Sequence, residues 1–286
     1  MLSLFRLKRS LLLLVPLALL ACTSDDPPTS ETETETEGES GDGDGDPGDG
    51  DPGDGDGDPG DGDGEPGDGD GEPGELVQVS GDAFAFGPGG MVAGATVTIL
   101  ELPDQQTTTD RDGHFVFEAL PAGAAATFVF DRPGYPRIHT KTFTLPEQGS
   151  VERVTFQAPD DSVFAALAQI VGIVPDPEAC QIASTVTRVG KSLYDEGAHG
   201  EAGATVTISP SLPADHGPIY FNESVIPQLD LTETSDDGGV LYTNVPPGTY
   251  VLSASKDGVV FEDVTVQCDP DVLVNPSPPY GLQALP

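Results

Sequence analysis

The sequence is poor in basic residues and in the largest aromatic one. It contains no tryptophan and only 11 lysines and arginines, against 49 aspartates and glutamates, so its formal net charge is −38. A nucleic-acid-binding protein needs a basic surface that neutralises phosphates, and electrostatic attachment to an anionic membrane has the same requirement. Residues 25–75 hold 22 acidic residues, and residues 76–286 still hold 27 against 8 basic ones. The charge therefore argues against both kinds of partner.

Patterns of catalytic and metal-binding sites are also missing. A zinc carboxypeptidase motif needs Glu three residues after His, but the four histidines are followed there by Phe117, Thr142, Ala202 and Ile219. No His-x-His, Cys-x-x-Cys, Gly-x-Ser-x-Gly or P-loop pattern occurs. The segment Asp110-x-Asp112-Gly113 resembles the start of an EF-hand loop, but Pro121 stands at the twelfth position, where Glu is required. We expect no catalytic residue, no metal and no cofactor, and hence a protein that is not an enzyme.

Residues 1–21 have the pattern of a secretory signal. Three basic residues among the first ten precede an apolar run at 11–20, which is shorter than the roughly 20 residues needed to span a bilayer. The run ends in Leu19-Leu20-Ala21-Cys22. This ending resembles the bacterial lipobox, which implies cleavage before Cys22 and its acylation, and thus a membrane anchor. Thr23 follows instead of the Asp that retains enterobacterial lipoproteins in the inner membrane, which favours the outer membrane or the cell surface.

Residues 22–75 would form an acidic tether behind this anchor. The segment consists of Glu-Thr, Gly-Asp and Asp-Pro-Gly units with almost no apolar side chain. Such a composition cannot bury enough surface to offset its ordering entropy, so we expect disorder. As a flexible coil it would extend over roughly 40 Å. Gly-Asp repeats also occur in calcium-binding β-rolls, but those have an aliphatic residue in each turn, and this segment has none. A solvated spacer is the better interpretation.

The remaining chain contains an internal repeat. Val92–Ile99 reads VAGATVTI and Glu201–Ile208 reads EAGATVTI, so that only the first residue differs. An Asp-Gly pair follows each phrase, Asp112-Gly113 in one case and Asp237-Gly238 in the other. A repeat of this kind predicts two copies of one small domain, the second with about 16 additional residues between its two motifs.

Alternating apolar residues predict short β-strands in both copies. Val97 and Ile99 share one face of a strand, as do Phe115 and Phe117. Asp-Gly and Pro-x-Gly turns separate such strands at intervals of about 8–12 residues, which is typical of a β-sandwich. The predicted fold is all-β, with two tandem immunoglobulin- or transthyretin-like β-sandwiches at the residue ranges 76–158 and 178–286.

Residues 159–177 break the strand pattern and predict a helical connector between the two sandwiches. An Asp or Ser at 160–162 can cap a helix, and the apolar residues that follow recur at helical spacing: Phe164, Leu167, Ile170 and Val171. The pattern stops near Gly172, and prolines follow. We expect a short helix that packs against one of the sandwiches.

The cysteines predict a disulfide in the second sandwich. Cys22 is assigned to the lipid, which leaves Cys180 and Cys268 in an exported, oxidising environment. Cys180 alternates in phase with the apolar residues of its strand, and Cys268 does the same in a late strand. A Cys180–Cys268 bond would close a loop of roughly 90 residues and stabilise by about 4–5 kcal/mol on the chain-entropy estimate. Two buried free thiols are the alternative.

Four motifs of the first sandwich point to a known family. They are Gly-Ala-Thr-Val-Thr, Thr-Asp-Arg-Asp-Gly-His-Phe, Leu-Pro-Ala-Gly and Arg-Pro-Gly-Tyr, the last ending at Tyr135. In this combination the segment resembles the carboxypeptidase regulatory-like domain, a transthyretin-like sandwich common in bacterial surface lipoproteins. The second sandwich resembles it less, because Gly239 and Val240 replace a polar residue and Phe, and because an insert lies at about 209–230. The resemblance implies a scaffold of the carbohydrate-binding-like fold without catalytic residues.

Three functions are compatible with these features. The first is a non-enzymatic, lipid-anchored cell-envelope protein that displays two structural or interaction modules on a polyanionic spacer, with an envelope protein as partner. The second is glycan binding by the second sandwich, with Tyr220, Phe221 and Tyr280 as candidate ligand contacts; core packing is their alternative role. The third is an accessory subunit of a secretion or polysaccharide system. The sequence leaves the ligand, the oligomeric state and the choice between inner and outer membrane open.

Overall fold

In a computed structural model of the chain, the described residues are 75–87, 90–276 and 279–286. The predictions for the signal peptide, for Cys22 and for nearly all of the tether lie outside these residues. The described residues fall within one compact unit that comprises Gly67–Pro286. Among them, no helix has the length and apolar character needed to cross a membrane.

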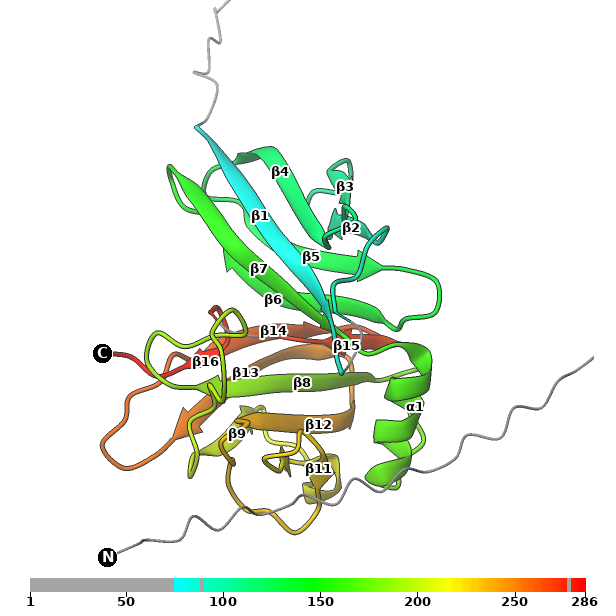
Figure 1. The fold of residues 1–286 in the computed structure, drawn as a ribbon, viewed down its shortest axis with the longest axis vertical. Coiled ribbons are helices and arrows are strands. Elements are labelled where there is room, and N and C mark those ends of the chain that lie inside the picture. The colour runs from blue at the N-terminus through cyan, green and yellow to red at the C-terminus, as the bar shows by residue number, and fades with distance from the viewer. Residues whose placement is uncertain (1–74, 88–89, 277–278) are drawn as a thin grey trace, which may run out of the picture. The chain divides into compact units, whose positions relative to one another are not determined.

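The first half folds into a β-sandwich. Its strands are β1 (Leu76–Ala85), β2 (Thr96–Ile99), β3 (Gln106–Thr108), β4 (His114–Pro121), β5 (Ala125–Asp131), β6 (Arg137–Thr144) and β7 (Ser150–Ala158). One layer has the order β4-β1-β7, and the other layer is formed by β6-β5-β2-β3 (Figure 1). Alternate side chains point between the layers, so that Phe115, Phe128, Phe130 and Phe156 are buried in one aromatic core.

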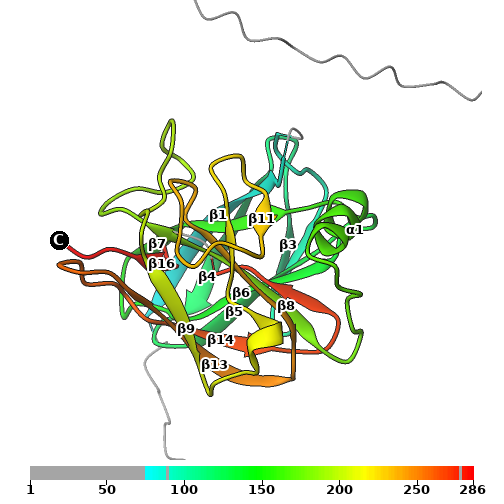
Figure 2. The ribbon, with the colours of Figure 1, turned by 90° about the horizontal axis from the view of Figure 1, so that it is seen from below.

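The second half folds into another β-sandwich with additional short elements. Its elements are β8 (Cys180–Thr187), β9 (Thr205–Ser209), η1 (Ala214–His216), β10 (Ile219–Phe221), β11 (Pro227–Gln228), β12 (Gly239–Val245), β13 (Gly248–Ser255), β14 (Val264–Cys268), β15 (Val272–Val274) and β16 (Leu282–Gln283). One layer has the order β14-β13-β9 (Figure 2), and the facing layer contains β11-β10-β12-β8-β15. The additional residues between the two repeat motifs form η1, β10 and β11.

The two halves use the same strand pairings. In the first half, β1 pairs antiparallel with β4 and parallel with β7, and β5 pairs with β2 and β6. In the second half, β8 pairs antiparallel with β12 and parallel with β15, and β13 pairs with β9 and β14. The repeated eight-residue phrases run into β2 and β9, which occupy equivalent positions in the two sets of pairings. The all-β fold of two sandwiches predicted from the sequence is confirmed.

A buried threonine holds each repeat phrase in the same way. The Thr109 hydroxyl accepts a hydrogen bond from the backbone N–H of Ala95 at 2.9 Å and donates to the carbonyl of Val92 at 2.9 Å. The Thr234 hydroxyl makes the equivalent bonds to Ala204 and Glu201 in the second half. Both threonines are about 3% exposed. The repeat therefore extends from the sequence to the hydrogen bonds that fix the entry of each strand.

Strand β15 joins the two sandwiches into one sheet. It lies between β8 and β6, parallel to both, so that the order β12-β8-β15-β6-β5 crosses from the second half into the first. Leu273 packs in the core of the first half, whereas its neighbours Val272 and Val274 pack in the core of the second. One short strand thus contributes to both cores, so that the two halves are joined in one folded unit.

The predicted connector helix is present as α1 (Asp161–Ile170). The Asp160 side chain accepts a hydrogen bond from the N–H of Val163 at 2.8 Å, which caps the first turn. The helix ends before Gly172, which has a φ of 73°. The predicted helix is therefore confirmed, and of the capping candidates at 160–162 the structure uses Asp160.

The predicted disulfide is also present. Cys180 of β8 and Cys268 of β14 are bonded, with their Cα atoms 5.6 Å apart, and both are fully buried. Because β8 and β14 belong to opposite layers, the bond links the two sheets of the second sandwich through its core. In both strands the cysteine lies on the same face as the buried apolar residues, as the sequence pattern indicated. The two sulfur atoms therefore meet in the core.

Candidate functional site

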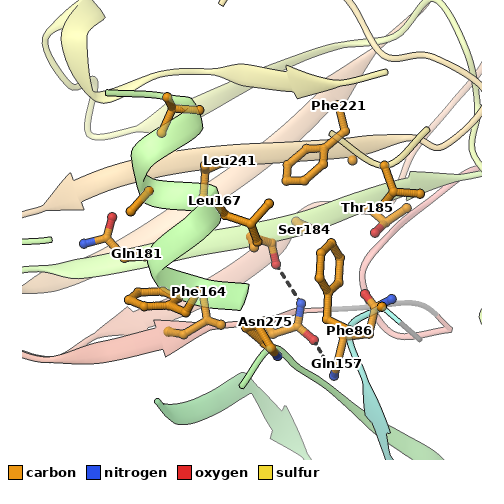
Figure 3. A pocket seen from close by; sticks show the side chains of 18 of the residues that line it. Phe86, Gln157, Phe164, Leu167, Gln181, Ser184, Thr185, Phe221, Leu241 and Asn275 are labelled. Atoms are coloured by element: carbon orange, nitrogen blue, oxygen red, sulfur yellow. Dashed lines mark hydrogen bonds between the residues drawn. The ribbon is translucent and has the colours of Figure 1, made fainter. Parts of the chain in front are cut away.

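The structure contains a cavity of about 550 Å³ between α1 and the large sheet (Figure 3). Its lining comes from α1, from β8 and β12 of the second sandwich, and from the ends of β1 and β7 of the first. The cavity is partly open to solvent, and the exposed residues Ser224 and Val225 lie on its rim. Its volume falls within the range of roughly 300–1,000 Å³ that is usual for small-molecule sites.

Most of the cavity wall is apolar. Helix α1 contributes Phe164, Leu167 and Ala168, whose spacing places them on one side of the helix. Phe86 follows β1, and Phe221 ends β10; their rings meet edge to face with centroids 6.5 Å apart (Figure 3). The wall therefore suits the apolar body of a ligand.

The polar side chains on the sheet side are largely bonded to the protein itself. Gln181 exchanges two hydrogen bonds with Asn244, one to the side chain and one to the backbone N–H, each 2.9 Å long. The Ser184 hydroxyl donates to the carbonyl of Pro276 at 3.2 Å. These groups fix the local structure and have little capacity left for a ligand.

Asn275 links the two sandwiches through hydrogen bonds at the edge of the cavity. Its side-chain carbonyl accepts a hydrogen bond from the N–H of Gln157 in β7 at 3.1 Å. Its side-chain amide donates to the carbonyl of Ala183 in β8 at 2.9 Å. Its own N–H donates to the carbonyl of His139 in β6 at 2.7 Å. One buried amide thus holds three strands from both halves, which makes the cavity a feature of their union.

His199 and Asp237 are the titratable side chains among the described lining residues. Asp237 precedes Gly238 in the Asp-Gly turn, and its carboxylate accepts a hydrogen bond from the N–H of Gly239 at 3.1 Å. Burial raises the pKa of the Asp237 carboxyl, partly opposed by this hydrogen bond and by His199. Nδ1 of His199 is buried and makes no hydrogen bond within the described part of the chain. This end of the cavity is its polar end.

The turn requires glycine at position 238. Its φ is 79°, and a Cβ there would lie 2.2 Å from the carbonyl oxygen of Val186. Only glycine combines a positive φ with so close an approach of two chains. The Asp-Gly pair seen in the sequence therefore holds the Asp237 carboxylate at the cavity through a turn that tolerates no side chain.

The three predicted aromatic contacts do not form one group. Tyr220 is 2% exposed, and its hydroxyl accepts a hydrogen bond from the N–H of Val206 in the core. Phe221 lines the cavity, as described above. Tyr280 instead packs against Phe143 of the first sandwich, with ring centroids 5.2 Å apart. Alternation along β10 turns Tyr220 and Phe221 to opposite faces. Tyr220 therefore has the core-packing role given above as the alternative, and of the three only Phe221 lines the cavity.

Two residues that join the two halves were not singled out in the sequence. Asn275 is one, and Tyr194 is the other: its hydroxyl donates to a carboxylate oxygen of Asp82 at 2.6 Å, and Arg153 lies 5.0 Å from its ring centroid. Tyr194 thereby fastens a loop of the second half to the first. These contacts join residues 112 and 118 positions apart, so no local periodicity could have indicated them.

A metal-binding or nucleophilic site at the cavity would require a particular arrangement of side chains. The described residues include no cluster of three or more His, Cys, Asp or Glu side chains able to hold a metal ion. The Ser184 hydroxyl at the cavity is engaged by a backbone carbonyl, whereas a nucleophile needs an adjacent base. The cavity offers an apolar wall and one carboxylate–imidazole end.

Residues 86–159 match the family described as carboxypeptidase regulatory-like domain. The match covers the first sandwich from the end of β1 to the end of β7, in agreement with the resemblance of its motifs. The second sandwich lies outside the matched range. A search of the curated proteins finds no match to this chain.

Similar solved structures are bacterial proteins of low identity. The Bacillus anthracis TIE protein is 16% identical over 70% of this chain, with a TM-score of 0.25, and the chain spans 33% of its length. The minor pilin GBS52 of Streptococcus agalactiae is 11% identical, with 73% and 97% of the two chains covered and a TM-score of 0.24. A Bacteroides uniformis protein described as carbohydrate binding is 11% identical, with 67% and 96% covered and a TM-score of 0.25. At TM-scores this low, the likenesses carry no argument about function.

Proposed function

We propose that this protein is a non-enzymatic, lipid-anchored component of a bacterial cell envelope that presents a fused pair of β-sandwiches on an acidic spacer. The anchor would be Cys22, and the spacer the segment 22–75. The observation that carries the proposal is the connection through β15. This strand joins both sandwiches in one sheet and packs in both of their cores. The two sandwiches thus form one folded unit, here called the head, and a display module needs such a unit. The role that we propose for this head is structural or one of interaction, with an envelope protein as partner.

The proposal includes a common origin of the two sandwiches. The same four strand pairings and the same threonine hydrogen bonds in both halves support it. We infer that the second sandwich is a diverged copy of the first that gained η1, β10 and β11 as an insert. Because the insert contributes Phe221 and the rim of the cavity, the divergence is also what built the candidate site.

The anchor can be tested by metabolic labelling in a bacterial host. The full-length chain should incorporate a clickable fatty-acid analogue and sediment with membranes, whereas Cys22→Ser should do neither. Substitution of Thr23 by Ser serves as the matched control and should leave both results unchanged. A chain that remains unlabelled while it reaches the envelope would contradict the lipid anchor. Digestion of intact cells with an external protease then separates a surface-facing head from a periplasmic one.

Glycan binding and an accessory role in a secretion or polysaccharide system remain alternatives of different kinds. The glycan hypothesis rested on a shared aromatic surface, and Tyr220 is a core residue. A glycan array probed with the Cys22→Ser protein at high micromolar concentration tests that hypothesis directly. Co-purification from envelope extracts tests the subunit hypothesis, and absence of any specific envelope partner would count against both the subunit and the interaction role.

A further inference from the structure

We propose that the cavity beneath α1 binds a small organic cation, an amine with an aliphatic or aromatic body, whose ammonium group pairs with the carboxylate of Asp237. This binding activity goes beyond the display role and does not depend on the lipid anchor. It rests on the size of the cavity, on the chemistry of its wall, and on the charges that line it.

The charges of the lining select against anions. Asp237 is the acidic residue there, and the described lining residues include no lysine or arginine. No ion pair of Asp237 is formed within the described part of the chain, and Arg188 pairs instead with the neighbouring Asp236 at 2.8 Å. His199 is the other titratable side chain of the lining, and it opposes the rise that burial causes in the pKa of the Asp237 carboxyl. A carboxylate or phosphate ligand would be repelled by Asp237, whereas an ammonium group would add the ion pair that this carboxylate lacks within the described residues.

The partial burial of Asp237 gives the ammonium a further advantage. Burial raises the pKa of this carboxyl, which means that the charged form is poorly solvated in the free protein. A cation placed beside it would compensate for the lost hydration. The negative charge of the whole chain acts in the same direction, because a field of one sign raises the local concentration of oppositely charged ligands.

The wall fits the body of such an amine. Phe86 and Phe221 present aromatic rings, which attract cations through their quadrupoles and also pack against apolar groups. Leu167 and Phe164 of α1 close the opposite side (Figure 3). A sugar would fit less well, since Gln181 and Ser184 already bond to the protein and could not satisfy many additional hydroxyl groups.

The tether is not a suitable occupant of the cavity. Its residues 25–75 carry 22 acidic side chains and no lysine or arginine, so it would bring like charge to Asp237. The same composition creates a background that the experiment must remove, because an amine will associate loosely with the tether. Variants at the cavity distinguish the two kinds of binding, since they leave the tether untouched.

The test uses three ligands of nearly equal shape and different charge. Binding of 1-naphthylmethylamine, 1-naphthalenemethanol and 1-naphthoate to the Cys22→Ser full-length protein is measured by calorimetry at pH 7 and at physiological salt. We expect saturable one-to-one binding of the amine, at least tenfold weaker binding of the alcohol, and no binding of the carboxylate. Equal affinities of amine and alcohol, or no binding of the amine at millimolar concentration, would overturn the proposal.

Two variants assign the binding to the cavity. Asp237→Asn retains the carbonyl that accepts from Gly239 and should lower amine affinity to that of the alcohol, without loss of the folded state by circular dichroism. Ala168→Phe fills the cavity from α1 and should abolish binding of both ligands, while Ala165→Phe on the exposed side of the helix should leave binding unchanged. Amine binding that persists undiminished in Asp237→Asn would refute the pairing with this carboxylate, and binding that also survives Ala168→Phe would place the amine on the tether instead of in the cavity.

Discussion

Single buried polar residues affect stability both at the two repeat phrases and at the junction of the two sandwiches beside β15. The buried hydroxyls of Thr109 and Thr234 each accept one backbone hydrogen bond and donate another, and these bonds hold the start of each repeat phrase in place. His139 represents the opposite case. It lies in β6 beside β15, is 1% exposed, and neither ring nitrogen makes a hydrogen bond within the described residues. The first type of residue stabilises, and the second makes stability depend on pH.

Substitution of the repeat threonines should destabilise both halves by similar amounts. Thr109→Val retains the side-chain shape but removes two hydrogen bonds to the backbone, at roughly 1 kcal/mol each, so that the free energy of unfolding should fall by about 2 kcal/mol. Thr234→Val should have the same effect. Urea denaturation gives the comparison, and Thr→Ser at either position is the control that keeps the hydroxyl. A Thr→Val variant as stable as the unaltered protein would show that these bonds are dispensable.

His139 should make the protein acid-sensitive. Burial, reinforced by Arg137 and opposed by Asp269 and Glu101, lowers the pKa of His139 to about 4. Since the unfolded chain binds its proton near pH 6.5 and the folded chain only near pH 4, the stability from this group is complete above pH 6.5 and is lost as the pH falls through that window. The loss at pH 4 should be roughly 3 kcal/mol.

The contribution of His139 is measured as a difference between proteins. Urea titrations of the unaltered protein and of His139→Phe at pH 7 and pH 4.5 should give a markedly smaller acid effect in the variant, because the carboxylates respond alike in both. If the two proteins lose stability in parallel, the imidazole is not the group responsible.

At the scale of elements, local patterns predicted most of what is observed. The cap at Asp160 and the helical spacing that begins at Phe164 indicated α1, and the alternation of apolar residues indicated the strands and the phase of both cysteines. Such signals lie within a few residues of each other, which is why they can be found in a single sequence. The sequence could not decide between ligand contact and core packing for Tyr220, because residue type alone does not say which face of a strand meets solvent.

The disulfide is the strongest single link between elements. Cys180→Ala with Cys268→Ala should lower the free energy of unfolding by about 4–5 kcal/mol, because the bond closes a loop of 88 residues of separation. The measurement is equilibrium unfolding in urea, compared with the Cys22→Ser protein that keeps the bond. Mass spectrometry after alkylation without reductant is the accompanying check, and two alkylated cysteines in the folded protein would contradict the bond itself.

At the scale of the whole molecule, the fusion of the halves could not be predicted from the sequence. Strand β15 has three residues, and its partners in β6 and β8 lie far away along the chain. Residues Asn275 and Tyr194 act over similar separations, and the cavity exists only because α1 packs across the joined sheet. Contacts of this kind depend on tertiary packing, which leaves no periodic trace in the amino-acid order.

The fusion should make unfolding cooperative over the entire described part. Scanning calorimetry of the Cys22→Ser protein should give one transition. Leu273→Ala, which removes a buried side chain from the shared strand, should lower stability by roughly 2–4 kcal/mol and shift that transition as a whole. Leu229→Ala, at a side chain that is 70% exposed, is the control and should change little. Two well-separated transitions in the parent protein would indicate that the sandwiches unfold independently.

The position of β15 near the carboxyl end also has a consequence for biogenesis. Until residues 272–274 have been synthesised, β6 and β8 each present an unpaired edge that could pair with another chain. The two sandwiches can therefore join only once residues 272–274 are available, and a chain cut before Val272 would leave two strand edges open to pairing with other chains.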